Sequence, residues 1–306
     1  MRRELSVAIA LVTLGIVLAV TAPRYFAAEN LRDMFLVNMP ILVVAIGTTL
    51  VILAGEIDIS VGSAFAVCSV VAGVAAKAGV PIAAIAVGTG VVGAAMGAMN
   101  GALVAYAGIP SIVVTLAAMI GLRDGLRWIT QGAWVEDLPA SFQWLGVSQR
   151  AFPVVTGVAV GALVAVVAWT MRNLAAGRAV YATGSDPEAA RLAGVRPRRV
   201  VFATFVLVGV LAALGAVLNA VRFPIVDPTA GTGLELEVIA AVVVGGTAVT
   251  GGRGTLAGTL IGVLLLATVG PALVFLGAAP QWERAIQGAI ILSAVAGNGS
   301  RRFAKA

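Results

Sequence analysis

The sequence predicts an all-α, polytopic membrane protein with about ten transmembrane helices in a single domain, residues 1–306. Hydrophobic residues make up 60% of the chain and charged residues only 11%, whereas soluble domains are about one-quarter charged. A helix needs about 20 mainly apolar residues to cross the hydrocarbon layer, and apolar runs near this length recur along the whole chain. These observations exclude a soluble domain.

Ten apolar segments reach or approach the spanning length. The third, fifth and eighth are short, and short segments interrupted by glycine are typical of broken or re-entrant helices in transporters. The predicted spans are 5–22, 35–54, 61–76, 81–106, 109–122, 152–171, 200–221, 238–249, 255–276 and 282–296.

The only long polar segment inside the apolar sequence runs from residue 172 to residue 199. It carries six arginines against two acids, Asp186 and Glu188. Arg and Lys accumulate in cytoplasmic loops, so we expect this loop in the cytoplasm. An even number of spans then places both termini there, and both termini are basic. The acids expected on the external side are Glu136, Asp137, Asp227, Glu235 and Glu237.

A short helix is predicted within this basic loop. Asp186 suits the capping position and Pro187 the first helical position, and the helix should stop at Gly194. An ordinary basic loop would only fix the topology; the alternative is a helix that docks a cytoplasmic partner. The residues of this candidate docking helix are Asp186, Pro187, Glu188, Ala189, Ala190, Arg191 and Gly194.

Similar features recur five spans apart. A stripe of glycines at every fourth residue occurs in the fourth and ninth spans, and acids introduce the third and the eighth. An odd offset means that the halves, 1–150 and 151–306, are inserted in opposite orientations, as in many transporters. Chance matches among 37 glycines are the alternative. We expect spans four and nine to pack closely through the stripes, which are Gly93, Gly97 and Gly101, and Gly254, Gly258 and Gly262.

Polar residues near the apolar spans are candidates for a gate or a translocation path. A carboxylate at membrane depth costs a few kcal/mol, which makes Glu56 and Asp58 functional candidates. The predicted orientation places both near the cytoplasmic ends of spans two and three, so we interpret Asp58 or Ser60 as a cap of the third helix, with gating as the alternative. Asn100 is the best buried polar candidate, and helix–helix hydrogen bonding is its alternative role.

Several chemistries lack their usual residues. The chain has no His and one Cys, Cys68, which leaves no metal-ligand cluster and no evident acid–base set for a membrane enzyme. No phosphate loop of the nucleotide-binding type occurs. We therefore expect no cofactor or metal, and the net charge of +6 follows from the cytoplasmic loops without nucleic acid. An ion-coupled secondary transporter with Glu56 or Asp58 as its ion site is the alternative function, although no predicted span carries an acid at its middle.

Four segments together are characteristic of one family: AGEIDISVGS at 54–63, residues 100–125, residues 177–195 with the Glu-Ala-Ala-x-x-x-Gly pattern at 188–194, and residues 231–262. In this order they resemble the monosaccharide branch (ribose, xylose, rhamnose and autoinducer-2 systems) of the permease subunits of ATP-binding-cassette importers. QGAWVEDLP at 131–139 and YATG at 181–184 are most similar to the rhamnose and autoinducer-2 members. Glu56 departs from the Gly of many members and resembles one partner of a pair of non-identical permeases.

This resemblance implies a translocation subunit without its own ATPase site. A second permease, identical or paralogous, would complete the path in the lipid bilayer. Cytoplasmic cassette ATPases would bind the ATP and dock on residues 186–194. A periplasmic or extracellular binding protein would deliver the sugar-like solute. The implied location is the bacterial cytoplasmic (inner) membrane.

Overall fold

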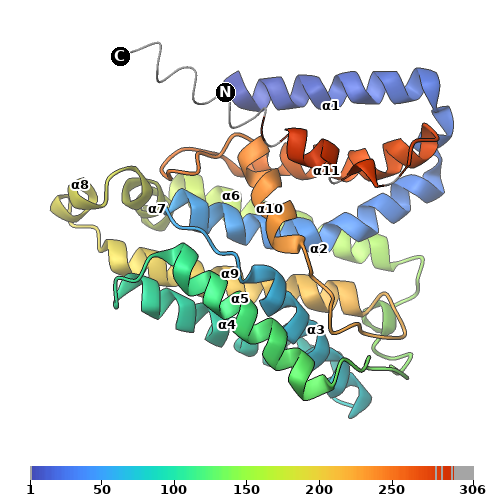
Figure 1. The fold of residues 1–306 in the computed structure, drawn as a ribbon, viewed down its shortest axis with the longest axis horizontal. Helices are drawn as coiled ribbons and strands as arrows, with labels where there is room; N and C mark the ends of the chain where they lie inside the picture. The colour runs from blue at the N-terminus through green and yellow to red at the C-terminus, as the bar shows by residue number, and fades with distance from the viewer. Residues whose placement is uncertain (1, 280, 284, 291, 293–306) are drawn as a thin grey trace.

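The computed structural model describes residues 2–279, 281–283, 285–290 and 292, and it is a bundle of helices (Figure 1), which confirms the all-α class. Two 3-10 helices, η1 (Pro23–Phe26) and η2 (Gln143–Gly146), lie between the longer elements. The α-helices are α1 (Arg2–Thr21), α2 (Ala28–Leu53), α3 (Val61–Lys77), α4 (Ile82–Ala105), α5 (Ser111–Thr130), α6 (Phe152–Asn173), α7 (Ala175–Ser185), α8 (Pro187–Leu192), α9 (Pro197–Ala220), α10 (Leu234–Val244) and α11 (Leu256–Phe275).

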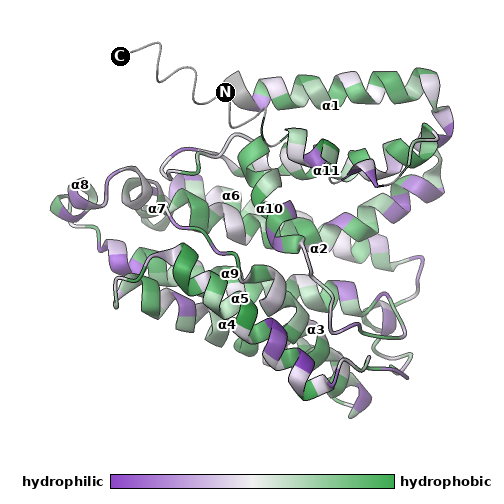
Figure 2. Ribbon diagram, viewed as in Figure 1, coloured by the Kyte–Doolittle hydropathy of each residue, from purple (hydrophilic) through white to green (hydrophobic). Residues whose placement is uncertain are grey.

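Among the residues that the structure describes, six helices are long and apolar enough to cross a membrane: α1, α2, α4, α6, α9 and α11. Figure 2 shows apolar residues along the length of the bundle and polar residues gathered near its two ends. The polytopic membrane class is therefore confirmed. The count of ten spans stays a prediction, because the last expected span, 282–296, falls partly outside the described residues, although those described between 282 and 292 are helical.

α2 and α9 form the centre of the bundle. α9 packs on α2, α3 and α4, and α2 also packs on α10 and α11. α2 and α11 are joined by a hydrogen bond of 2.8 Å between the buried hydroxyls of Thr49 and Thr259. α1 lies apart from this core and packs mainly on α11 (Figure 1).

α5 is longer than the sequence predicted. The apolar run ends at Leu122, but the helix continues for two more turns to Thr130 and stops at Gln131, whose φ is +52°. The charged residues that end the apolar run, Arg123 and Asp124 among them, therefore lie within the helix. Long charged side chains near a helix end can reach polar surroundings without breaking the helix.

The segment that leads into α3 enters the bundle as an extended chain. The Ile57 amide donates to Ser111 Oγ at the first residue of α5, and Ser63 Oγ donates to the carbonyl oxygen of Met119 in the middle of α5, at 3.2 and 2.9 Å. Eight helical residues correspond to about 12 Å of rise. α3 therefore begins inside the bundle, deeper than the sequence predicted.

The segment that leads into α10 enters from the opposite end. Val226 packs against Gly73 of α3, and Gly231 reaches Gly62 in the first turn of α3. α10 is only 11 residues long and begins beside the start of α3. The short third and eighth spans are thus broken spans, in which a non-helical segment enters the bundle from one end and a short helix continues toward the other. Their chains enter from opposite ends, which is the arrangement that two inverted halves would produce.

The two glycine stripes pack closely, but against different helices. A Cβ atom on Gly93 or Gly97 of α4 would overlap a backbone carbonyl oxygen of α9, and a Cβ atom on Gly258 or Gly262 of α11 would overlap one of α10 or the turn after it. The α4 stripe therefore joins the two halves, whereas the α11 stripe lies within one half, so the stripes are not equivalent. Gly254 lies outside α11, in the turn before it, with φ +153°.

Candidate functional site

The predicted docking helix is present as α8, and its ends are made by the predicted residues. Asp186 Oδ1 accepts hydrogen bonds from the amides of Glu188 and Ala189 at 2.9 and 3.0 Å, with Pro187 at the first helical position. Gly194 follows the helix with φ +84°, and the Val195 amide returns to the carbonyl oxygen of Ala190 at 3.0 Å. A larger residue would adopt this backbone only with strain.

The outer face of α8 carries one ion pair. Glu188 Oε1 lies 3.2 Å from Arg191 Nη2, and these side chains are 77% and 68% exposed. Such an exposed pair contributes little to stability, because water screens it. The pair therefore presents one negative and one positive group, on adjacent turns, to whatever approaches this end of the protein.

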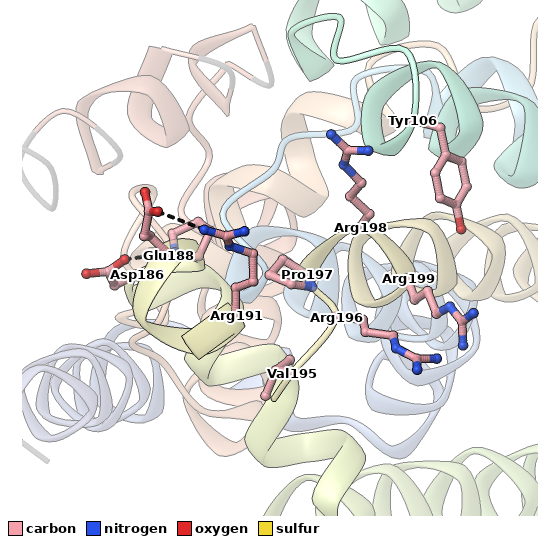
Figure 3. A pocket seen from close by; sticks show the side chains of 10 residues that line it. Tyr106, Asp186, Glu188, Arg191, Val195, Arg196, Pro197, Arg198 and Arg199 are labelled. Carbon is pink, nitrogen blue, oxygen red and sulfur yellow. Dashed lines mark hydrogen bonds and ion pairs between the residues drawn. The ribbon is translucent and has the colours of Figure 1, made fainter. Parts of the chain in front are cut away.

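Beside α8 lies a wide groove of about 1000 Å³ (Figure 3), which we call the α8 groove. α8 supplies one wall, the start of α9 supplies the other, and Tyr106 comes from the end of α4. Four arginines against two acids make the groove basic, so it suits an acidic protein surface. Its lining residues are Tyr106, Asp186, Pro187, Glu188, Arg191, Val195, Arg196, Pro197, Arg198 and Arg199.

α7, the helix directly before α8, lies where the sequence predicted only a basic loop. Its buried residues Gly177, Val180 and Thr183 recur at intervals of three, which is the spacing of one helical face. That pattern is present in the sequence, although the charged residues around it favour a loop. α7 matters because it connects α8 to the membrane helices.

Three of the four candidate path residues lie together beside the start of α3. Asp58 Oδ1 accepts from the Ser60 amide and hydroxyl at 2.8 and 2.6 Å, and Asn100 Nδ2 donates to Ser60 Oγ at 2.8 Å. All three residues are at most 3% exposed, and Asn100 Oδ1 has no hydrogen-bond partner among the described residues. A cavity of about 10 Å³ adjoins them, which is close to the space of one water molecule.

The capping role predicted for Asp58 or Ser60 is wrong in detail. Ser60 occupies the capping position of α3, but its side chain makes no hydrogen bond to the helix amides, because Asp58 binds it. Glu56 stays apart from this cluster and is partly exposed. Burial raises the pKa of the Glu56 carboxyl, and a hydrogen bond with Ser111 partly offsets that shift.

An ion pair that the sequence did not predict joins α5 to α10. Arg123 Nη2 lies 3.4 Å from Glu235 Oε1. Glu235, expected among the external acids, is instead only 6% exposed, and its carboxylate lies so close to Gly62 that a Cβ atom there would overlap it. The pair therefore fixes the start of α10 against both α5 and α3. The two residues are 112 positions apart, so no local sequence pattern could predict that they form a pair.

Comparisons with known proteins agree on one family. The sequence profile of the family described as "Branched-chain amino acid transport system / permease component" matches residues 30–295. The chain is 35% identical over 308 residues to the autoinducer 2 import system permease protein LsrC of Salmonella typhi, covering 99% of this chain and 87% of that protein. The protein of the same name from Yersinia pseudotuberculosis serotype O:1b (strain IP 31758) is 35% identical over 303 residues, covering 99% and 86%. No solved structure matches. The matched residues include α3, α8 and α10.

Proposed function

Because the chain belongs to the branched-chain amino acid transport permease family, we propose that it forms the membrane path of an ATP-binding-cassette importer for autoinducer 2 or a related monosaccharide. The relatives are named autoinducer 2 import permeases, and we propose this solute because of that name. The proposed mechanism rests on α8, a capped helix of six residues that lies exposed beside a basic groove.

Within this proposal, α8 and the α8 groove bind a cytoplasmic cassette ATPase, which holds the ATP. Arg196, Arg198 and Arg199 offer fixed positive charge, and complementary charge steers and orients protein partners. A second permease subunit, identical or paralogous, completes the translocation path. A binding protein supplies the solute from outside.

The α8 end of the bundle faces the cytoplasm in this proposal. The carboxylate of Glu4, near the N-terminus, is hydrogen-bonded to the hydroxyl of Thr255. The turn before Thr255 contacts α7, so the N-terminus, this turn and α8 share one end of the bundle. Arg253 and the six arginines of residues 172–199 also lie there, as the preference of basic loops for the cytoplasm predicts. A cytoplasmic ATPase reaches α8 only in this orientation.

Exchanging the two charges of α8 tests the docking site. The double variant Glu188→Arg/Arg191→Glu keeps an ion pair within the helix but inverts the charges offered to a partner. We expect ATPase binding and solute uptake to fall at least about tenfold, because a misplaced like charge at an interface costs more than about 1.4 kcal/mol. The measurements are co-purification of the ATPase from membranes and uptake of autoinducer 2. The amount of inserted permease should be unchanged.

The matched control is Leu192→Ser, which alters an 81% exposed side chain on the same helix without changing its charge. We expect smaller losses from this variant than from the charge exchange. Wild-type uptake together with full ATPase retention in the exchanged variant contradicts α8 as the docking site.

A further inference from the structure

The end of α7 contacts backbone segments from both halves of the chain at a cluster of four glycines. We call this cluster the glycine junction, and its residues are Gly55, Gly184, Gly251 and Gly252. A Cβ atom on Gly184 would overlap the carbonyl oxygen of Leu53 and lie 2.7 Å from the Gly252 amide nitrogen. A Cβ atom on Gly251 would lie 2.7 Å from Gly55 Cα and 2.8 Å from the Gly184 carbonyl oxygen. Three chain segments therefore touch backbone to backbone, with no side chain between them.

Hydrogen bonds hold the junction together on both sides. The Gly252 amide donates to the Leu53 carbonyl oxygen at 2.9 Å, joining the turn after α10 to the end of α2. Tyr181 Oη donates to the Gly254 carbonyl oxygen at 3.0 Å, joining α7 to the same turn. Burial, and then the nearby charge of Glu4, raise the pKa of the Tyr181 phenol, so its hydroxyl remains a proton donor at neutral pH.

The junction is linked to α8 without a flexible spacer. α7 ends at Ser185, and the next residue, Asp186, caps α8. On the other side of the junction, Gly55 begins the extended segment that leads into α3, and Gly252 precedes α11 and follows α10. Close-packed contacts are poorly compressible and pass displacements on rather than absorbing them.

We propose that the glycine junction transmits movement of α8 to the broken spans of both halves at once, with Gly184 and Tyr181 as positioning residues. One docked ATPase would then act on the entry to α3 and on the turn between α10 and α11 through a single point. The inference rests on the proposed function, because it requires a partner that moves α8. It also explains why α7 carries glycine at position 184, where a side chain would separate the segments.

The test uses the assembled transporter, with permease, ATPase and binding protein, in proteoliposomes containing ATP. In Gly184→Ala the added Cβ forces the segments apart, while α8 and its groove are unchanged. We expect the ATPase to remain bound and to hydrolyse ATP, but the autoinducer 2 imported per ATP hydrolysed to fall at least about fivefold, the lower range of coupling between sites. A purely structural defect would lower uptake and hydrolysis together.

Gly161→Ala in α6 is the matched control, because a Cβ atom there meets nothing within 4 Å. Tyr181→Phe serves as a second variant, since it removes one hydroxyl and adds no bulk. It should lower the same ratio several-fold with a normal yield of folded protein, which keeps the test decisive if Gly184→Ala does not fold.

An import-to-hydrolysis ratio in Tyr181→Phe, and in any folded Gly184→Ala, equal to that of Gly161→Ala overturns the role of the junction. A wild-type assembly that neither binds the ATPase nor imports the solute contradicts the proposed function instead. The two failures are therefore distinguishable.

Discussion

Gly97→Leu is expected to remove most of the folded protein from the membrane. A Cβ atom on Gly97 already overlaps the carbonyl oxygen of Phe205, so the whole of α4 would have to move away from α9. Overpacking of a close interface typically costs about 1–3 kcal/mol. We expect the upper end of that range or more, because the obstacle is backbone rather than a side chain that can turn aside. This interface also joins the two halves.

Gly88→Leu is the matched control on the same helix, because a Cβ atom there meets nothing within 4 Å. The measurement is the yield of monodisperse protein after detergent extraction, together with the midpoint of thermal unfolding. Equal yields and midpoints for Gly97→Leu and Gly88→Leu would show that α4 and α9 do not depend on this close approach.

Arg123→Ala is expected to destabilise the protein more than the double change Arg123→Ala/Glu235→Ala. The single change leaves the buried carboxylate of Glu235 without its ion-pair partner. Removing one member of a buried pair costs about 3–5 kcal/mol. Because the Arg123 side chain is 29% exposed, we expect about 2 kcal/mol, with part of the loss recovered when the carboxylate is removed as well.

Arg127→Ala, one turn further along α5, is the control, because no ion pair of Arg127 occurs among the described residues. The measurement is the free energy of unfolding in the same detergent of the wild type, Arg123→Ala, Glu235→Ala and the double variant, arranged as a double-mutant cycle, with Arg127→Ala measured beside them. Additive losses from the two single changes, with no recovery in the double variant, would contradict a stabilising pair between α5 and α10.

Local sequence signals predicted local structure well. The cap of α8 depends on Asp186 and Pro187, and its end depends on Gly194, so all the information lies within nine residues and the prediction is confirmed. The membrane class follows in the same way from apolar length. The basic segment around α8 also indicated a docking surface, which stays a proposal.

Features set by distant contacts could not be predicted in the same way. The depth at which α3 begins depends on hydrogen bonds from residues 57 and 63 to α5, and the burial of Glu235 depends on Arg123 and Gly62. The glycine stripes indicated close packing but not the partner helix, because any backbone can fill the space beside a glycine. Glycine spacing alone therefore suggested a symmetry between α4 and α11 that their packing does not share.

The most direct measurement of the central claim is uptake of autoinducer 2 into proteoliposomes that contain the permease, its cassette ATPase and its binding protein. We expect accumulation that requires ATP on the α8 side of the membrane and that persists when proton and sodium gradients are abolished. With that result, the buried Asp58 is a structural group at the start of α3. It is not the ion site that an ion-coupled transporter would need. Uptake that follows an imposed ion gradient and needs neither ATP nor the ATPase would contradict the importer and favour the ion-coupled alternative.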